Sequence, residues 1–367
     1  MAQPEPTGKD AGGVAPTAAG TDWPRRLLAQ PLEHLYPGYF AQVMATGIIS
    51  TAFAIAGVRV LSFALLGVAL LAFVLLVISF ALRLARYAGA FRSDTSDAGR
   101  AFGFFTFVAA SGVLALRLAL AKQAPLFGVF AALCACSWVA CSYALVPWVV
   151  TRAAKGTVRE SVTGAWLIWV VATQSMALVA IRCGGLWPDW SGPLDLAALS
   201  LWSAGALLYL LLMSSLLARL LLVPTERPDM SPTYWIAMGA TAISVFTGIS
   251  LLGLVGGPSP LQLIAPTVAG MSFMLWALGT WWVPLLVVLT AWRVSGRHGL
   301  RAYDPALWSV VFPLGMYSVA TMGLGHRLHV TALVVLGKEE SWFALTAWLV
   351  TMGLLVRSSI GPRRGSW

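Results

Sequence analysis

Long apolar stretches, separated by short segments of polar and charged residues, run along this chain from about residue 37 to about residue 357. A membrane-spanning helix needs about 20 mostly apolar residues, and ten stretches meet that requirement. We predict spans at residues 37–57, 62–82, 102–121, 126–150, 162–182, 195–217, 233–254, 265–291, 306–326 and 341–357. The pattern therefore predicts an all-α integral membrane protein with ten transmembrane helices.

The predicted spans form a series of pairs. The odd-numbered spans begin near residues 37, 102, 162, 233 and 306, so a unit of two spans recurs every 60–75 residues. Five helical hairpins with one topology are typical of a repeat array. This prediction depends on spacing and hydropathy, because the five units share little sequence.

The odd-numbered spans carry polar or small residues near mid-depth, whereas the even-numbered spans are plainer. These residues are Thr46 and Gly47, Ser111 and Gly112, Thr173, Gln174 and Ser175, Thr247, Gly248 and Ser250, and Pro313, Gly315 and Ser318. Polar groups at bilayer depth are costly unless they face protein or water. Close helix packing through small residues would explain any one of them. Their recurrence in five spans favours an inner ring of helices around a central pathway.

Composition agrees with a membrane protein and separates the tails from the spans. The chain is 59% hydrophobic and 10% charged, whereas soluble domains carry about 25% charged residues. The start of the chain lacks the apolar core of a signal peptide. We expect a disordered cytoplasmic tail over residues 1–34, a membrane domain over 35–357 and a second cytoplasmic tail over 358–367.

The basic residues predict the orientation of the spans. Eighteen of the 24 Lys and Arg residues flank one side of the predicted spans. Cytoplasmic loops carry this excess, so we expect both termini in the cytoplasm of a multi-pass plasma (inner) membrane protein. A nucleic-acid partner is not expected, because the positive charge is spread over separate short loops rather than gathered on one face.

Four arginines lie at the predicted outer ends of odd-numbered spans. They are Arg59, Arg117, Arg182 and Arg327. Positive charge around a low-dielectric rim concentrates anions, so these residues are candidates for attracting anions to an outer mouth. Arginines at span ends also extend to the interface without any substrate role, and for Arg59 and Arg327 that alternative stays open. Arg117 lies deeper in its span, which favours a functional role.

Other chemistries find little support in the sequence. All acidic residues are placed near predicted span ends or in loops, which disfavours a proton-coupled carrier and favours passive conduction. An enzyme is disfavoured, since no mid-membrane histidine or carboxylate is placed to activate a nucleophile. A membrane scaffold is a further alternative. His326 and His329 have zinc-ligand spacing but no further fixed ligand, so we predict neither metal nor cofactor.

Three segments resemble a known family. They are HLYPGYFAQVMATGIISTAFAIAG from His34 to Gly57, WLIWVVATQSMA from Trp166 to Ala177, and WSVVFPLGMYSVAT from Trp308 to Thr321. Each is similar to the corresponding span of the tellurite-resistance/dicarboxylate transporter family. That family includes bacterial tellurite-resistance channels, fungal malate and sulfite permeases and the slow-type anion channel of plant guard cells.

The resemblance implies an architecture and a gate. It implies five helical hairpins with quasi-fivefold symmetry around a central pore, lined by the odd-numbered helices, in a homotrimer. Phe312, immediately before Pro313, would plug the pore, and Gly47 would lie against it. An aromatic residue in a membrane helix otherwise usually just packs against its neighbours. Mid-depth proline occurs in the ninth span but not in the other odd-numbered spans.

The expected function is conduction of small anions or C4-dicarboxylates, with malate, sulfite and tellurite as candidate substrates. The predicted pore-lining residues are Thr46, Gly47, Ser111, Gln174, Thr247, Gly248 and Ser318. Hydroxyls, amides and helix backbone solvate an anion without trapping it. A proton-coupled dicarboxylate or sulfite carrier is the alternative, and a membrane enzyme is the remote one.

Overall fold

The computed structural model describes residues 32–152, 162–224, 227, 230–254, 261–295 and 303–360. Within these ranges the chain forms helices and no strand. Ten helical stretches in this part of the chain are long and apolar enough to cross a membrane, which confirms the predicted all-α membrane protein. The predicted tails 1–34 and 358–367 lie outside the described residues, apart from three residues of each.

The ten stretches alternate between two kinds of helix, which we call inner and outer. The inner helices are α2 (Ala41–Ala56), α6 (Phe105–Leu120), α10 (Ile168–Leu186), α12 (Ile236–Leu252) and α14 (Trp308–Leu328). The outer helices are α3 (Arg59–Arg86), α7 (Ala124–Ala140), α11 (Ser191–Leu222), α13 (Leu261–Val294) and α15 (Thr331–Ile360). A π-helical turn (Cys141–Leu145) extends α7 into α8 (Val146–Arg152), and the short helices α4 (Ala88–Ser96) and α5 (Ala98–Ala101) follow α3.

Burial separates the two kinds of helix clearly. In the most apolar part of each stretch, 72–83% of the residues are buried in the inner helices, against 17–28% in the outer helices. Apolar side chains on the outer helices are left for contact with lipid, as expected for a membrane protein. The predicted division into an inner set of odd-numbered spans and an outer set of even-numbered spans is therefore present in the fold.

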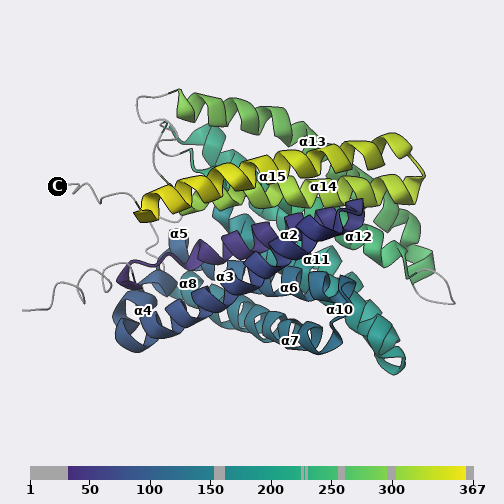
Figure 1. Cartoon of the computed structure of the whole chain (residues 1–367), viewed down its shortest axis with the longest axis horizontal. Helices are drawn as coiled ribbons and strands as arrows, with labels where there is room; N and C mark the ends of the chain where they lie inside the picture. Colours follow the sequence, from purple (N-terminus) through teal and green to yellow (C-terminus); the bar gives the residue numbers. More distant parts are fainter. Residues whose placement is uncertain are drawn as a thin grey trace, which may run out of the picture.

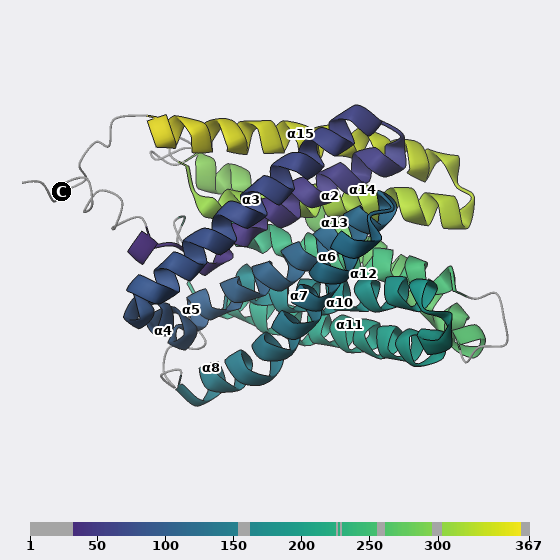
Figure 2. The ribbon, with the colours of Figure 1, turned by 60° about the horizontal axis from the view of Figure 1, so that its bottom comes forward.

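The inner helices form a closed ring. Each touches two others, in the order α2, α6, α10, α12, α14 and back to α2. Figure 1 shows the contact that closes the ring, with the first hairpin (α2) lying beside the last (α14 and α15). Figure 2 shows α6, α7, α10 and α11 on the other side of the same bundle. Every outer helix packs on its own inner partner and on the next inner helix. The rotational symmetry that would relate the units stays a prediction.

Each inner helix begins with a 3₁₀ turn. The turns are η1 (Pro37–Phe40), η2 (Phe102–Phe104), η4 (Gly164–Leu167), η7 (Pro232–Trp235) and η9 (Pro305–Leu307). They touch one another in the same circular order as the inner helices. The N-termini of all five inner helices therefore gather at one end of the ring, which we call the near end. The far end is where each inner helix stops and its outer partner begins.

The sequence of these turns explains why they form. Proline occupies the first turn of η1, η7 and η9, where its missing N–H is not needed and its φ angle suits a helix start. The side chains of Thr163, Ser231 and Asp304 accept hydrogen bonds from backbone N–H groups two residues later, at 3.3, 3.3 and 2.9 Å. Such caps satisfy donors that have no partner inside the helix.

Glycine allows the turns to approach closely. A Cβ atom on Gly164 would lie 2.1 Å from the carbonyl oxygen of Thr233 in η7. We expect Gly164→Ala to lower the thermal unfolding midpoint in detergent by about 5 °C. Overpacking of this kind costs about 1–3 kcal/mol, and 1 kcal/mol shifts the midpoint by about 2–4 °C. Gly185→Ala is the control, because a Cβ there meets nothing within 4 Å. Equal midpoints for the two variants would contradict this account of the near end.

One predicted span has the wrong start. The tenth span was expected over 341–357, but α15 begins at Thr331 and includes Lys338, Glu339 and Glu340. The three charged residues lower local hydropathy and resemble a loop in sequence. In the fold they are accommodated because Lys338 and Glu339 are exposed, while Gly337 packs closely on α14. The expectation that all acidic residues lie near span ends is therefore wrong for Glu340.

Candidate functional site

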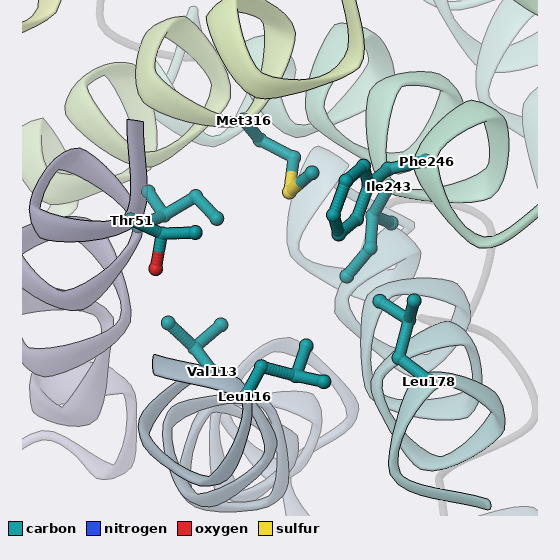
Figure 3. Close-up of a pocket in the computed structure, with 8 residues that line it drawn as sticks. Thr51, Val113, Leu116, Leu178, Ile243, Phe246 and Met316 are labelled. Carbon is teal, nitrogen blue, oxygen red and sulfur yellow. The ribbon is translucent and has the colours of Figure 1, made fainter. Parts of the chain in front are cut away.

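The axis of the inner ring contains a small cavity to which all five inner helices contribute. Its volume is about 10 Å³, close to the minimum that holds one water molecule. Figure 3 shows the side chains pointing toward this shared space. The lining residues are Ile48 and Thr51 of α2, Val113 and Leu116 of α6, Leu178 of α10, Ile243 and Phe246 of α12, and Met316 of α14. The ring therefore surrounds a narrow, mostly apolar centre.

Thr51 is the polar member of this lining. Its hydroxyl donates to the carbonyl oxygen of Gly47, 3.0 Å away in the preceding turn of α2. The hydroxyl oxygen can still accept a hydrogen bond. The other side chains that line the cavity are apolar. A centre of this kind excludes water and ions until it widens, because hydrophobic constrictions close by dewetting.

Phe312 lies one helical turn from the cavity. It precedes Met316 by four residues on α14, so the two side chains share one face of the helix. Phe312 is 1% exposed. The next residue, Pro313, faces α12 instead, where its ring lies against Gly239. Helical phase thus directs Phe312 toward the axis on the near-end side of the cavity, and its role as a gate stays a prediction.

The hydrogen bonds of three predicted pore-lining residues reach outer helices. The Thr46 hydroxyl accepts from the indole N–H of Trp348 on α15 at 2.9 Å. Ser318 donates to the carbonyl oxygen of Gly337, also on α15, at 2.7 Å. Gln174 donates to the carbonyl oxygen of Trp202 on α11 at 3.1 Å. These three hydrogen bonds therefore lie on the outer side of the ring, between inner and outer helices.

The other four predicted lining residues make contacts within or between helices. Ser111 and Thr247 donate to backbone carbonyls one turn earlier, each at 2.8 Å. Gly47 lies against Val113 of α6, and Gly248 lies against Ser272 of α13. None of the seven predicted residues is among the side chains that line the cavity. The role of these residues in a pathway stays a prediction.

A recurring interface explains much of the polarity of the inner helices. Four outer helices each direct a tryptophan indole N–H to the inner helix of the next hairpin. The pairs are Trp138 with Thr173 at 3.1 Å, Trp202 with the Ser244 carbonyl at 2.9 Å, Trp276 with Thr321 at 3.2 Å, and Trp348 with Thr46 at 2.9 Å. Between α3 and α6 the stacked rings of Phe73 and Phe107, 5.5 Å apart, occupy this place. Polar residues in membrane helices commonly serve such packing.

Arg117 is buried near the far end of α6. Its side chain is 2% exposed and donates to the hydroxyls of Ser50 and Ser62, at 2.9 and 2.8 Å. The two serines also bond each other's carbonyl oxygens, each at 2.6 Å. No ion pair to Arg117 is found among the described residues. An uncompensated positive charge is therefore held one residue from Leu116, which lines the cavity.

The remaining far-end arginines are exposed. Arg59 and Arg182 lie at helix ends, and Arg327 donates to the carbonyl oxygen of Leu252, the last residue of α12, at 2.7 Å. The C-terminus of a helix carries a partial negative charge, which a nearby cation offsets. Since all five inner helices end here, these arginines reduce the negative potential at the far end.

The near end combines five positive helix N-termini with two acidic residues that form ion pairs. Asp94 bonds Arg83 at 2.7 Å and Arg100 at 2.6 Å, and Asp304 bonds Arg293 at 3.2 Å. Burial raises the pKa of Tyr303, so this phenol stays neutral beside η9. The helix N-termini therefore contribute positive potential at this end.

None of the eight residues that line the cavity was predicted from the sequence. Thr51 and Phe246 adjoin polar positions that were singled out, since Thr51 follows Gly47 by one turn and Phe246 precedes Thr247. An apolar residue that faces an axis has the same hydropathy as one that faces lipid. Thr51 shares a helix face with Gly47 and is predictable from it, but no signal in the sequence marks Leu178 or Ile243.

These features define a multi-pass α-helical membrane protein with five inner helices arranged around one axis. The described metal-ligating residues form no group of three or more that could hold a metal ion. Residues 34–356 match the model of the voltage-dependent anion channel family, and the chain belongs to that family. This match confirms the resemblance found in the sequence, and the family is one of anion channels and transporters.

Two relatives agree with this assignment. The chain is 43% identical over 145 residues to an uncharacterized membrane protein of Mycobacterium tuberculosis, which covers 39% of this chain and 73% of that protein. It is 28% identical over 152 residues to an uncharacterized transporter of Methanocaldococcus jannaschii, covering 41% of this chain and 42% of that protein. Both are similar to less than half of this chain.

Proposed function

We propose that this protein is a passive anion channel whose pathway is the axis of the inner ring. The observation that carries the proposal is the closed ring of five inner helices around a cavity that all five line.

Electrostatics favour anions along this axis. Five helix N-termini at the near end each carry about half a positive charge, and Asp94 and Asp304 beside them are ion-paired. The far end holds the buried cation Arg117 and three exposed arginines. The near-end helix termini attract anions, and at the far end the arginines offset the negative helix C-termini. Malate, sulfite, tellurite, nitrate and chloride are the candidate substrates.

The described conformation is closed, and opening requires the apolar centre to widen. A cavity of about 10 Å³ is too small for a hydrated anion. Movement of Phe312 and Met316 away from the axis would admit water and then the ion. Pro313 frees a backbone carbonyl one turn earlier and loosens α14 at this position. We therefore propose Phe312 as the gate, with Pro313 as the point of flexibility.

The proposal includes an orientation and an assembly. With both termini in the cytoplasm of the plasma membrane, the near end faces inward. A membrane potential of 100 mV, negative inside, then favours anion exit by about 2.3 kcal/mol per charge. Three copies would assemble into a homotrimer, each with its own pathway, which chemical cross-linking in native membranes tests.

Flux from proteoliposomes tests the channel. Purified protein is reconstituted with labelled chloride, nitrate, sulfite or malate, and a potassium gradient with valinomycin sets the voltage. We expect flux that is linear in anion concentration and driven by voltage. The proton-coupled carrier is favoured by a separate observation, the carboxyl group of Glu340 inside α15. Saturating flux that requires a pH gradient at zero voltage would replace the channel with that carrier.

A further inference from the structure

A carboxyl group lies inside the membrane domain, outside the axis. Glu340 is the tenth residue of the 30-residue helix α15. At about 1.5 Å per residue, it lies about 8 Å from the midpoint of that helix. It is half-buried, and its Oε2 atom is buried without a hydrogen-bond partner in the described structure. Its neighbours Lys338 and Glu339 are exposed.

The surroundings of this carboxyl group are polar but uncharged. Thr321 of α14 lies beside it, and Tyr317, one turn earlier, is also close. The Thr321 hydroxyl accepts from the indole N–H of Trp276 on α13 at 3.2 Å, and the Tyr317 hydroxyl is hydrogen-bonded to that of Thr280 on α13. The Trp276 and Tyr317 rings are stacked, with centroids 6.5 Å apart. Polar side chains of α14, hydrogen-bonded to α13, thus form a polar cluster beside this carboxyl group.

No cation within the described residues compensates a negative charge at this position. The ion pairs found there involve Asp94 and Asp304, both at the near end. On α14 the titratable groups are Tyr317 near the carboxyl, and His326 and Arg327 at the far end; α2 has none. On α13 the charged group is Arg293, which pairs with Asp304. An ionised carboxylate without a partner is costly at membrane depth, whereas the neutral acid is not.

The polar cluster belongs to the proposed gate helix. Tyr317 and Thr321 belong to α14, and Tyr317 directly follows Met316, which lines the cavity. The α14–α15 contact is tight: Ser318 donates to the Gly337 carbonyl at 2.7 Å, and a Cβ on Gly337 would lie 2.7 Å from the Met322 backbone nitrogen. Charge on Glu340 would draw water to the polar cluster and loosen this contact.

We propose that Glu340 is a proton-binding site that controls the position of α14. With the proton bound, α14 and α15 pack as observed and the axis is closed. Loss of the proton loosens α14, and the anion pathway opens. The effect on flux rests on the proposed channel, whereas proton binding itself does not. The inference therefore needs one measurement that involves flux and one that does not.

Stability provides the measurement without flux. Glu340→Gln replaces the neutral acid with a group of the same size that cannot ionise. A carboxyl group that binds its proton more tightly in the folded state contributes stability at low pH, and that stability is lost as pH rises. We expect Glu340→Gln and the wild-type protein to unfold at the same temperature at pH 5. At pH 8 the variant should unfold about 2–4 °C higher. Glu339→Gln is the control at an exposed position, and its unfolding temperature should equal that of the wild type at both pH values.

Flux provides the second measurement. In proteoliposomes with equal pH on both sides, we expect wild-type chloride flux to rise at least threefold from pH 5 to pH 8. Glu340→Gln should stay at the low value throughout, and Glu339→Gln and Glu340→Asp should keep the rise. A temperature difference that does not change with pH would overturn the proton site. A pH-dependent temperature difference with pH-independent flux would overturn the control of α14. Absence of flux from every protein would contradict the channel and leave the stability result to decide the site.

Discussion

Replacing Phe312 with alanine is expected to raise anion flux at least tenfold. The substitution removes a benzyl group that helical phase directs toward the axis, next to a cavity already lined by apolar side chains. A wider centre holds water more readily, and the dewetting barrier falls. A barrier lower by only about 1.4 kcal/mol gives a tenfold higher rate. The measurement is voltage-driven chloride flux from proteoliposomes, normalised to the amount of folded protein.

Phe53→Ala is the matched control for this experiment. Phe53 is also a fully buried phenylalanine on an inner helix, but its ring packs edge-on against Trp342 of α15, 4.9 Å away between centroids. The two substitutions create similar voids, one toward the axis and one behind the ring. Phe53→Ala should lower stability without raising flux. If both variants gain flux equally, loosening of the ring explains the result and Phe312 is not the gate.

Replacing Arg117 with methionine is expected to reduce anion flux about tenfold without lowering stability. The guanidinium is buried and lies beside the helix face that lines the cavity. At roughly one helix diameter, about 10 Å, and an effective dielectric constant of about 20, its attraction for an anion is about 1.7 kcal/mol. That energy corresponds to more than a tenfold change in local anion concentration. We expect the free energy of unfolding to stay the same for two reasons. Methionine avoids the several kcal/mol that burying a charge costs, and the hydroxyls of Ser50 and Ser62 keep their hydrogen bonds to each other's carbonyl oxygens.

Two further variants separate charge from packing at Arg117. Arg117→Lys keeps the positive charge and should retain most of the flux. Arg182→Gln removes a charge from the same end of the ring, but that arginine is exposed and salt screens it, so its effect should be less than twofold. Equal flux from wild-type protein and Arg117→Met, with both folded, would remove Arg117 from the attraction of anions and leave it a purely structural role.

The spans and their pairing were predictable because they depend on quantities that hydropathy measures. Apolar length and the alternation of polar and plain spans located the ten helices and divided them into inner and outer sets, and the fold confirms both. The start of α15 was not predictable in this way. Glu340 lies beside the polar side chains of Thr321 and Tyr317 on α14, and such tertiary contacts leave no trace in the residues around it.

The polar positions of the inner helices were found, but their directions were not. Thr46 and Thr173 stand out in sequence because a hydroxyl group inside a membrane helix requires a hydrogen-bond partner. In the fold, the indole N–H groups of Trp348 and Trp138 donate to these hydroxyls. The direction of a side chain depends on helix rotation, which neighbouring helices determine. The cavity residues stayed hidden for a related reason, since side chains facing lipid and side chains facing a closed, dry axis have the same chemistry.

Chemical access to Thr51 tests most directly whether the ring axis is the anion pathway. Thr51→Cys is introduced together with Phe312→Ala in a protein whose four native cysteines are replaced by alanine, and a negatively charged thiosulfonate is added during chloride flux. Leu71→Cys, whose side chain points outward from α3 and is 61% exposed, serves as the comparison. We predict that the reagent modifies Cys at position 51 and blocks flux, and that Cys at position 71, which faces lipid, is not modified and flux is unchanged. Continued chloride flux through protein fully modified at position 51 would contradict conduction along this axis.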